Sequence, residues 1–187
     1  MAEGTRDRIL DALEALLLED GAPGITLEAV AARAEVSKGG LLYHFPGKEQ
    51  LLVGAVERLG ERVAAQLDTA IANGESIARW YLEPADTESD TDVAMTRSIL
   101  AVMRSADGAY DEVQRHLVRI MRRYDAHLVA ELGDPVKAEI VRLMGDGVYL
   151  GQIIGMPAPD PELHRQAIER LLGGDASSGE TPGSSSP

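Results

Sequence analysis

Cysteine is absent from this sequence and aromatic residues are few, which narrows both its chemistry and its fold. Without cysteine the chain has no disulfide, no thiolate metal site and no cysteine nucleophile. Aromatic residues make up 4% of the chain against 44% for all apolar residues, so the core is built mainly from Leu, Ala, Val, Ile and Met. Such a core favours helices over sheets. We therefore predict an all-α protein, and 187 residues suffice for one or two domains.

Long apolar runs are also missing. No segment approaches the roughly 18 consecutive apolar residues of a membrane span. The apolar residues near the N-terminus are periodic, unlike the continuous run of a secretion signal. We expect a soluble, cytoplasmic protein without a membrane partner.

Positive charge is scarce, which argues against nucleic-acid binding. The net charge is −13, and residues 1–50 hold five Lys or Arg against nine Asp or Glu. However, two of the three lysines, Lys38 and Lys48, bracket one short segment. A phosphate contact acts within about a Debye length, roughly 10 Å at 0.1 M salt, so local placement can outweigh net charge. The balance predicts weak non-specific DNA binding and leaves specific binding open.

The segment 37–48 has the pattern of a short helix that exposes polar groups. Ser37 is a natural N-cap residue, and Pro46 ends the helix. An apolar face is formed by Leu41, Leu42 and Phe45. The donors left without an evident partner are Lys38, Tyr43 and His44. Glycines 39 and 40 each cost about 1 kcal/mol relative to Ala inside a helix, so this backbone is expected to lie close to something large.

Two helices are predicted before this segment. The first spans residues 5–19, with apolar residues at helical spacing, and the breaker cluster 20–24 ends it. Thr26 can cap a second helix over residues 27–34. Glu35 and Val36 then leave only a tight turn before Ser37. A helix, a tight turn and a second short helix form a helix-turn-helix, and we interpret residues 37–45 as a DNA-recognition helix.

The runs 24–31 (GITLEAVA) and 37–51 (SKGGLLYHFPGKEQL) closely resemble the TetR family of transcriptional repressors. The resemblance covers about the first 60 residues, and the YHFPGK ending is its most specific part. It implies an all-helical, homodimeric protein with a C-terminal domain that binds a small-molecule effector. It also implies a double-stranded DNA operator as partner.

The resemblance assigns DNA contacts residue by residue. Thr26 would touch a phosphate, and the groups facing bases or backbone in the major groove would be Ser37, Lys38, Gly39 and Gly40. The phosphate-gripping residues would be Tyr43, His44 and Lys48. Two positions depart from the family pattern. Gly40 stands where many members have Thr, which removes a hydroxyl contact. Gly47 stands where Ser often caps the next helix, at a cost of roughly a few tenths of a kcal/mol.

The remainder of the chain also reads as helical. Further helices are predicted over residues 48–72, 76–83, 91–106, 110–132, 135–155 and 161–172, giving about nine in all. Asp134-Pro135 and Asp160-Pro161 each place Asp at the N-cap and Pro at the first helical position. Residues 84–90 are predicted to form a polar loop. We divide the chain into a helix-turn-helix domain (1–50), a helical ligand-binding and dimerisation domain (51–174) and a disordered tail (175–187).

Glycines recur at every fourth position in 147–155 and share a helix face with apolar residues. One interpretation is close packing within the subunit. The other is a homodimer interface, which the family resemblance favours, formed by Ile140, Met144, Gly147, Gly151 and Ile154.

Methionine and aromatic residues at helical spacing are most often ordinary core. As a set, however, they could line an adaptable apolar ligand pocket. The candidates are Trp80, Met103, Tyr110, Met121, Tyr124, Met144 and Tyr149.

No metal site, cofactor or catalytic centre is predicted. The acidic run 86–92 lacks the glycine and the final glutamate of an EF-hand, since Arg97 stands at the twelfth position. His116 and His127 are separated by about 16 Å of helical rise. The sequence therefore predicts a DNA-binding, ligand-responsive repressor and not an enzyme. The alternative is an acidic helical protein–protein interaction module.

Overall fold

The computed structural model describes residues 2–19, 25–83, 87–105 and 110–173. In these ranges the chain forms ten α-helices and one 3₁₀ helix, without a strand. The helices of the N-terminal part are α1 (Ala2–Glu19), α2 (Leu27–Arg33), α3 (Lys38–His44) and α4 (Lys48–Ala72). They are followed by α5 (Ile77–Leu82), α6 (Thr87–Ser105), α7 (Asp111–Met121), η2 (Arg122–Tyr124), α8 (Asp125–Leu132), α9 (Pro135–Ile154) and α10 (Pro161–Leu172). The predicted all-α class is confirmed.

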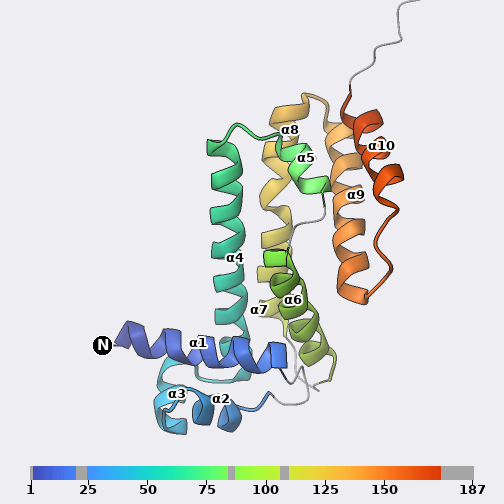
Figure 1. Ribbon diagram of the computed structural model, residues 1–187. Coiled ribbons are helices and arrows are strands. Elements are labelled where there is room, and N and C mark those ends of the chain that lie inside the picture. Colours follow the sequence, from blue (N-terminus) through green and yellow to red (C-terminus); the bar gives the residue numbers. More distant parts are fainter. Residues whose placement is uncertain (1, 20–24, 84–86, 106–109, 174–187) are drawn as a thin grey trace, which may run out of the picture.

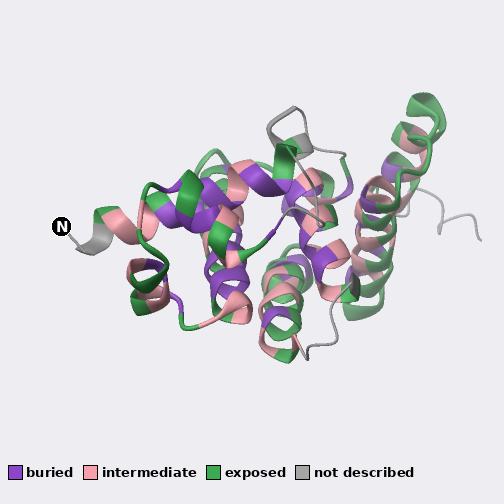
Figure 2. Cartoon of the chain, turned by 90° about the horizontal axis from the view of Figure 1, so that it is seen from below, coloured by how far each residue is buried: buried purple, intermediate pink, exposed green. Residues whose placement is uncertain are grey.

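The long helix α4 connects the two halves of the molecule (Figure 1). At its lower end α1 crosses it, with α2 and α3 beneath α1. At its upper end it meets α5, and α7 lies alongside it. Helices α9 and α10 form the side farthest from the N-terminus. Figure 2 shows that buried residues face inward, whereas these two helices stay largely exposed or half-exposed.

Each half of the molecule has its own cluster of buried apolar residues. The lower cluster joins α1, α2, α3 and α4 to α6 and α7, and its fully buried members include Leu10, Leu13, Leu41, Leu52 and Ile99. The upper cluster joins α5, α8, α9 and α10 to the end of α4, through Leu67, Leu82, Leu128, Val141 and Ile168. Because α6 contributes to the lower cluster, the helix-turn-helix shares its core with the rest of the chain.

Most predicted helix boundaries are confirmed. Helices α4 and α10 have the predicted bounds, and Asp134 and Asp160 cap α9 and α10 as expected. Three predictions were wrong. α1 begins at Ala2, and α6 begins at Thr87, inside the predicted loop 84–90, whose first three residues lie outside the described ranges.

The predicted helix 110–132 is the third error, because η2 divides it into α7 and α8 and raises the count from nine to ten. The tighter 3₁₀ turn places Tyr124 in the core, with its ring 4.9 Å from that of Tyr81 and 5.5 Å from that of Trp80 (centroid to centroid). The preceding residues Arg122 and Arg123 remain exposed. The predicted tail 175–187 lies outside the described residues.

Candidate DNA-binding surface

The recognition helix α3 is capped at its start and anchored by its apolar face. Ser37 Oγ accepts a hydrogen bond from the Gly40 amide at 3.0 Å, as predicted for an N-cap. Leu41 and Phe45 are buried, and Leu42 is half-buried. α3 is therefore held by one face and leaves the other open.

The turn before α3 is unusually tight. Glu35 has a positive φ of 53°, which is uncommon for a residue other than glycine. Two backbone hydrogen bonds close the turn, from the Glu35 amide to Ala32 O (3.2 Å) and from the Val36 amide to Ala31 O (3.0 Å). Thr26 caps α2 by accepting from the Ala29 amide at 3.1 Å, as predicted. These local bonds fix the angle between α2 and α3.

Most of the predicted DNA contacts are gathered on one exposed surface. Ser37, Lys38 and Gly39 are exposed at the start of α3, and Thr26 is exposed at the start of α2. Tyr43 is 83% exposed and makes an edge-to-face contact with the half-buried His44 at a ring distance of 5.2 Å. Apart from this contact with His44, the Tyr43 ring is open to solvent, which is consistent with a contact to another molecule.

Packing within the subunit does not require Gly39, whereas Gly40 leaves little room for a side chain. A Cβ added at Gly39 would meet only Ser37 Oγ, at 4.0 Å, and one at Gly40 would lie 3.2 Å from the same oxygen. The subunit itself therefore leaves room for a side chain at Gly39. A bare backbone here would allow a large partner to approach closely, and that approach stays a prediction.

Lys48 begins α4, directly after the predicted weak cap at Gly47, which makes no side-chain capping bond. Lys48 is half-buried, and this burial lowers the pKa of its ammonium group. Its position at a helix N-terminus places a cation beside unpaired backbone N–H groups. Such a combination is suited to binding a phosphate.

Glu28 is a member of this surface that the sequence did not reveal. Its carboxylate Oε1 accepts a hydrogen bond from Lys38 Nζ at 2.6 Å, although ten positions separate the two residues. The hydrogen bond from Lys38 is the main reason that the pKa of Glu28 lies below its usual value. The tight turn between α2 and α3 creates this pair, so helical spacing gives no signal for it.

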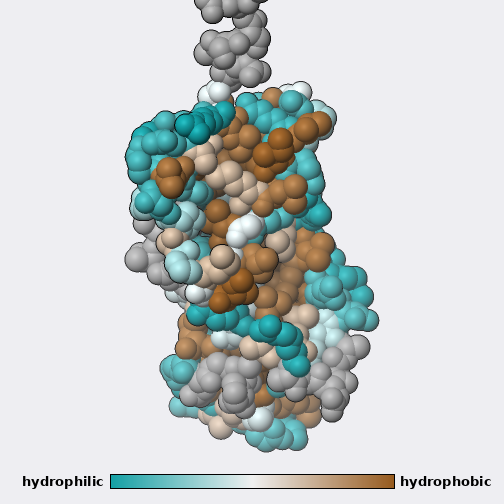
Figure 3. All heavy atoms as spheres, turned by 90° about the vertical axis from the view of Figure 1, so that its right-hand side faces the viewer, coloured by the Kyte–Doolittle hydropathy of each residue, from teal (hydrophilic) through white to brown (hydrophobic). Residues whose placement is uncertain are grey.

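The face of α9 that points away from the core is apolar. Its exposed large side chains are Val136, Ile140, Leu143, Leu150 and Ile154. Figure 3 shows the side of the molecule that carries α9 and α10, with hydrophobic residues gathered along it. A Cβ at Gly147 would meet nothing within 4 Å, so Gly147 does not serve packing within the subunit.

A hollow of about 260 Å³ lies on the same face, between α9 and the segment that leads to α10. Met144, Gly147 and Gly151 line one side of it, and Met156 and Pro157 line the other. The glycine of α9 that does pack closely within the subunit is Gly145, on the opposite side, where the Tyr81 ring covers it. The predicted apolar face is thus present and unpaired within one subunit.

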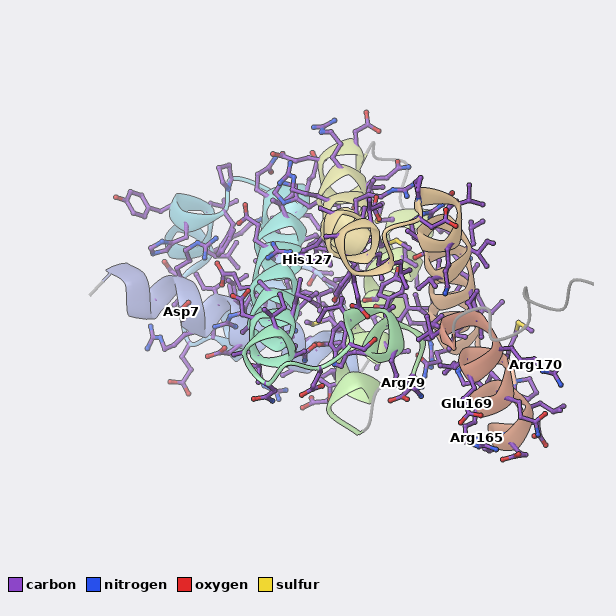
Figure 4. The ribbon with its side chains drawn as sticks, turned by 90° about the horizontal axis from the view of Figure 1, so that it is seen from above. Asp7, Arg79, His127, Arg165, Glu169 and Arg170 are labelled. Atoms are coloured by element: carbon purple, nitrogen blue, oxygen red, sulfur yellow. The ribbon has the colours of Figure 1, made fainter. Side chains whose placement is uncertain are left out.

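Charged side chains border this face on α10. Arg165 bridges Glu162 and Glu169, which lie about two helical turns apart, at 2.6 Å and 2.5 Å. Figure 4 shows Arg165, Glu169 and Arg170 pointing away from the rest of the molecule, at the far end from Asp7 of α1.

Helix α6 joins the recognition domain to α9. Ser98 Oγ donates to Leu17 O at the end of α1 (2.8 Å), and Arg97 donates to the carbonyls of Gln152 and Ile153 at the end of α9 (2.9 Å each). Arg62 of α4 adds an ion pair to both α1 and α6, with Glu14 at 3.2 Å and Asp92 at 3.0 Å. A displacement of α6 would therefore change its bonds to α1, α4 and α9.

Comparison with known proteins now decides the family. A family model described as "Bacterial regulatory proteins, tetR family" matches residues 9–55. A second, described as "Tetracyclin repressor-like, C-terminal domain", matches residues 75–173. The chain belongs to the tetR family. Members of this family are DNA-binding transcriptional regulators and not enzymes, and the same holds for this chain.

Curated tetR-family relatives include the HTH-type transcriptional repressor KstR of two organisms. The chain is 32% identical to that of Mycolicibacterium smegmatis over 163 residues, covering 80% of this chain and 74% of the relative. It is 30% identical to that of Mycobacterium tuberculosis over 192 residues, covering 92% and 82%. Because each match covers at least 80% of this chain, each includes a large part of the C-terminal domain.

Solved structures share the fold. SCO7518 of Streptomyces coelicolor A3(2) is 27% identical with a TM-score of 0.68, covering 90% of this chain and 98% of that one. The multidrug binding protein EbrR, complexed with ethidium, is 25% identical with a TM-score of 0.67 and the same coverage.

In this tetR-family chain, the predicted effector-pocket residues lie in different parts of the structure. Trp80, Tyr124 and Met144 belong to the upper cluster. Met103 and Tyr110 pack against the lower one. The remaining two are Met121, which is exposed, and Tyr149, whose hydroxyl shares a hydrogen bond with Thr96 at 3.0 Å.

The described ranges contain neither a membrane-spanning helix nor a cluster of metal ligands. No helix there is long and apolar enough to cross a membrane. No group of three or more His, Asp or Glu side chains in them could hold a metal ion.

Proposed function

We propose that this chain is a homodimeric, ligand-responsive repressor that acts in the cytoplasm and binds a palindromic operator through α3. The observation that carries the proposal is the division of α3 into a buried face and an open face. Leu41 and Phe45 anchor the helix in the core, while Lys38 and Tyr43 extend from it. Helix-turn-helix proteins present a recognition helix to the major groove in this way.

The DNA contacts follow from the position of each group. Ser37, Lys38 and the two glycines form the start of α3, the part of a recognition helix that meets base edges. Tyr43, His44 and Lys48 lie at the other end, next to the start of α4, where they would bind phosphates. Thr26 would bind a phosphate from the start of α2.

The apolar face of α9 supports a homodimer. Single exposed apolar residues are ordinary, but five large ones on one helix, beside an open glycine, form a patch of the kind that mediates association. Ile140, Met144, Gly147, Gly151 and Ile154 would form the centre of this interface, with the charged edge of α10 at its rim. Two α3 helices would then enter successive major grooves, about 34 Å apart.

An effector would bind within residues 51–174 and favour a dimer whose recognition helices no longer match that spacing. The domain has an aromatic group, Trp80, Tyr81 and Tyr124, beside the carboxylates Asp125 and Asp146. EbrR has been solved with ethidium and with imidazole, which supports a small-molecule ligand for this fold. The effector can shift the equilibrium only by its differential affinity for the two states. Helix α6 would transmit the shift, because it bonds both α1 and α9.

Selection of bound sites from a random duplex library tests the proposal. We expect a two-fold symmetric site whose halves are one helical turn apart. Affinity for the selected site should fall steeply as salt rises, because phosphate contacts release counterions. An acidic protein–protein interaction module would show no such slope.

Two variants test the assigned contacts. Tyr43→Ala and Lys48→Ala should weaken binding to all duplexes to a similar extent, because phosphate contacts carry no sequence information. Full operator affinity in the double variant at physiological salt would overturn the placement of α3. Glu19→Gln, an exposed change elsewhere in the same domain, serves as the control.

A further inference from the structure

The ion pair between Glu28 and Lys38 lies where the proposed function places base recognition. Lys38 is the first residue of α3, and Glu28 is the second residue of α2. The Glu28 side chain is 65% exposed and the Lys38 side chain 56%, and 2.6 Å separates the carboxylate oxygen from the ammonium nitrogen. If Lys38 faces the bases, the carboxylate beside it faces them too.

The two groups offer opposite hydrogen-bonding chemistry at one point. The ammonium group of Lys38 has three N–H donors, so it can keep its bond to Glu28 and still donate to a base. The carboxylate of Glu28 is only an acceptor when ionised. The bond from Lys38 lowers the pKa of Glu28 and so favours the ionised form. The first turn of α3 holds no acidic residue, so the fold supplies the acceptor from α2.

A donor beside an acceptor matches the major-groove edge of one base pair best. On a G·C pair, the guanine acceptors N7 and O6 lie next to the cytosine N4 donor. Lysine is a good partner for the two guanine acceptors, and glutamate accepts from cytosine N4. An A·T pair offers one fewer match: Lys38 could donate only to adenine N7 while Glu28 accepts from adenine N6, and in the placement that suits G·C the carboxylate would face the thymine O4 acceptor, which repels it.

We propose that the Glu28–Lys38 pair reads one G·C base pair in each half-site, with Lys38 donating to guanine and Glu28 accepting from cytosine. This inference rests on the proposed function and adds Glu28 as a specificity-determining residue. It also explains how an acidic domain gains selectivity. A carboxylate against the groove weakens binding wherever no base amino group meets it, since base-edge acceptors and phosphates surround it there.

The test uses the full-length protein and the duplex that the wild type selects from a random library. That site should contain a G·C pair at one defined position in each half. Replacing this pair by A·T in both halves should weaken wild-type binding by roughly tenfold or more for each half-site. Glu28→Gln keeps the shape of the side chain but removes its charge, and its amide can donate as well as accept. We expect this variant to discriminate between the two duplexes about tenfold less than the wild type, because it keeps the Lys38 contact to guanine but loses the charged acceptor for cytosine.

Glu19→Gln is the matched control, because Glu19 is also half-exposed and bonds Arg33 at 2.7 Å in the same domain. It should discriminate as the wild type does. Lys38→Gln should relax preference at the same base pair as Glu28→Gln. Circular dichroism would verify that each variant is folded.

The outcomes separate the two proposals. If the wild type selects no site, the proposed function fails. If it selects a symmetric site without a G·C pair in its halves, the inference alone is overturned. The inference also fails if Glu28→Gln discriminates G·C from A·T as the wild type does, or if Glu19→Gln relaxes the same position.

Discussion

Replacing Gly54 by Ala should reveal how α4 positions the recognition helix. Gly54 lies in the first half of α4, where the ring of Phe45 approaches it. A Cβ at this position would lie 2.8 Å from the Phe45 ring and 3.1 Å from a methyl group of Leu10. Both neighbours are buried, and the guanidinium group of Arg6 covers the Phe45 ring at 5.3 Å. Phe45 therefore has little room to move away.

The sign of the effect depends on that contact. At an open helical position, Gly→Ala stabilises by up to about 1 kcal/mol. Overpacking a filled core costs about 1–3 kcal/mol. Subtracting the helix gain from the overpacking cost leaves a decrease of up to about 2 kcal/mol in the free energy of unfolding for Gly54→Ala. For a protein of this size, that corresponds to a decrease in Tm of up to about 8 °C.

DNA binding should suffer more than stability. Phe45 is the residue that ends α3, so moving its ring tilts the helix that carries Lys38 and Tyr43. Loss of one good base contact would reduce operator affinity by roughly tenfold. Affinity for random duplex should change little, because non-specific contacts tolerate a tilt.

Thermal unfolding followed by circular dichroism, and operator titration at 25 °C, would measure the two effects at one protein concentration. Gly4→Ala is the control, because a Cβ at Gly4 would meet nothing within 4 Å, and it should not lower Tm. A higher Tm in Gly54→Ala would refute the packing argument. A lower Tm with unchanged operator affinity would refute the positional role of α4.

Three further predictions concern the C-terminal domain. Gly147→Leu has room within the subunit, so it should convert a dimer to a monomer at unchanged helicity; a dimer in analytical ultracentrifugation would contradict the α9 interface. Glu131→Ala removes the carboxylate that accepts hydrogen bonds from Ser76 and from the first two amides of α5. The free energy of unfolding should decrease by about 1–2 kcal/mol, which lowers Tm by about 2–8 °C. The exposed change Glu75→Ala is the control. Burial and the hydrogen bond to Asp146 raise the pKa of the Tyr81 hydroxyl. As pH rises, the unfolded chain therefore loses the Tyr81 hydroxyl proton before the folded chain does, so stability should decrease above about pH 10. Tyr81→Phe should flatten that decrease in a series of Tm measurements, and an unchanged slope would contradict the role given to Tyr81.

Helix starts and ends were predictable because they depend on a few neighbouring residues. The caps at Thr26, Ser37 and Asp160 each bond an amide two or three positions away, so the sequence contains both partners. The break at residues 122–124 was not predictable. It depends on the position of Tyr124 against two rings of α5, more than forty positions away.

The candidate site divides in the same way. Lys38, Tyr43 and Lys48 could be singled out from the sequence, because polar groups without a local partner remain visible between apolar residues at helical spacing. Glu28 could not, since its bond to Lys38 depends on the tight turn at Glu35. The apolar face of α9 was predicted from its spacing, whereas the close contact at Gly145 required the position of Tyr81.

By itself, the sequence determined the helical class, the capped helix α3 and the apolar face of α9, whereas the structure showed that this face is unpaired within the subunit. These features follow from periodicity and from side chains that bond their own backbone, which act over one or two turns. Only the tertiary structure decided which carboxylate lies beside Lys38, which ring lies against Gly54 and how α6 bonds α1 and α9. Those contacts join helices distant in the chain, and their geometry depends on how the helices pack.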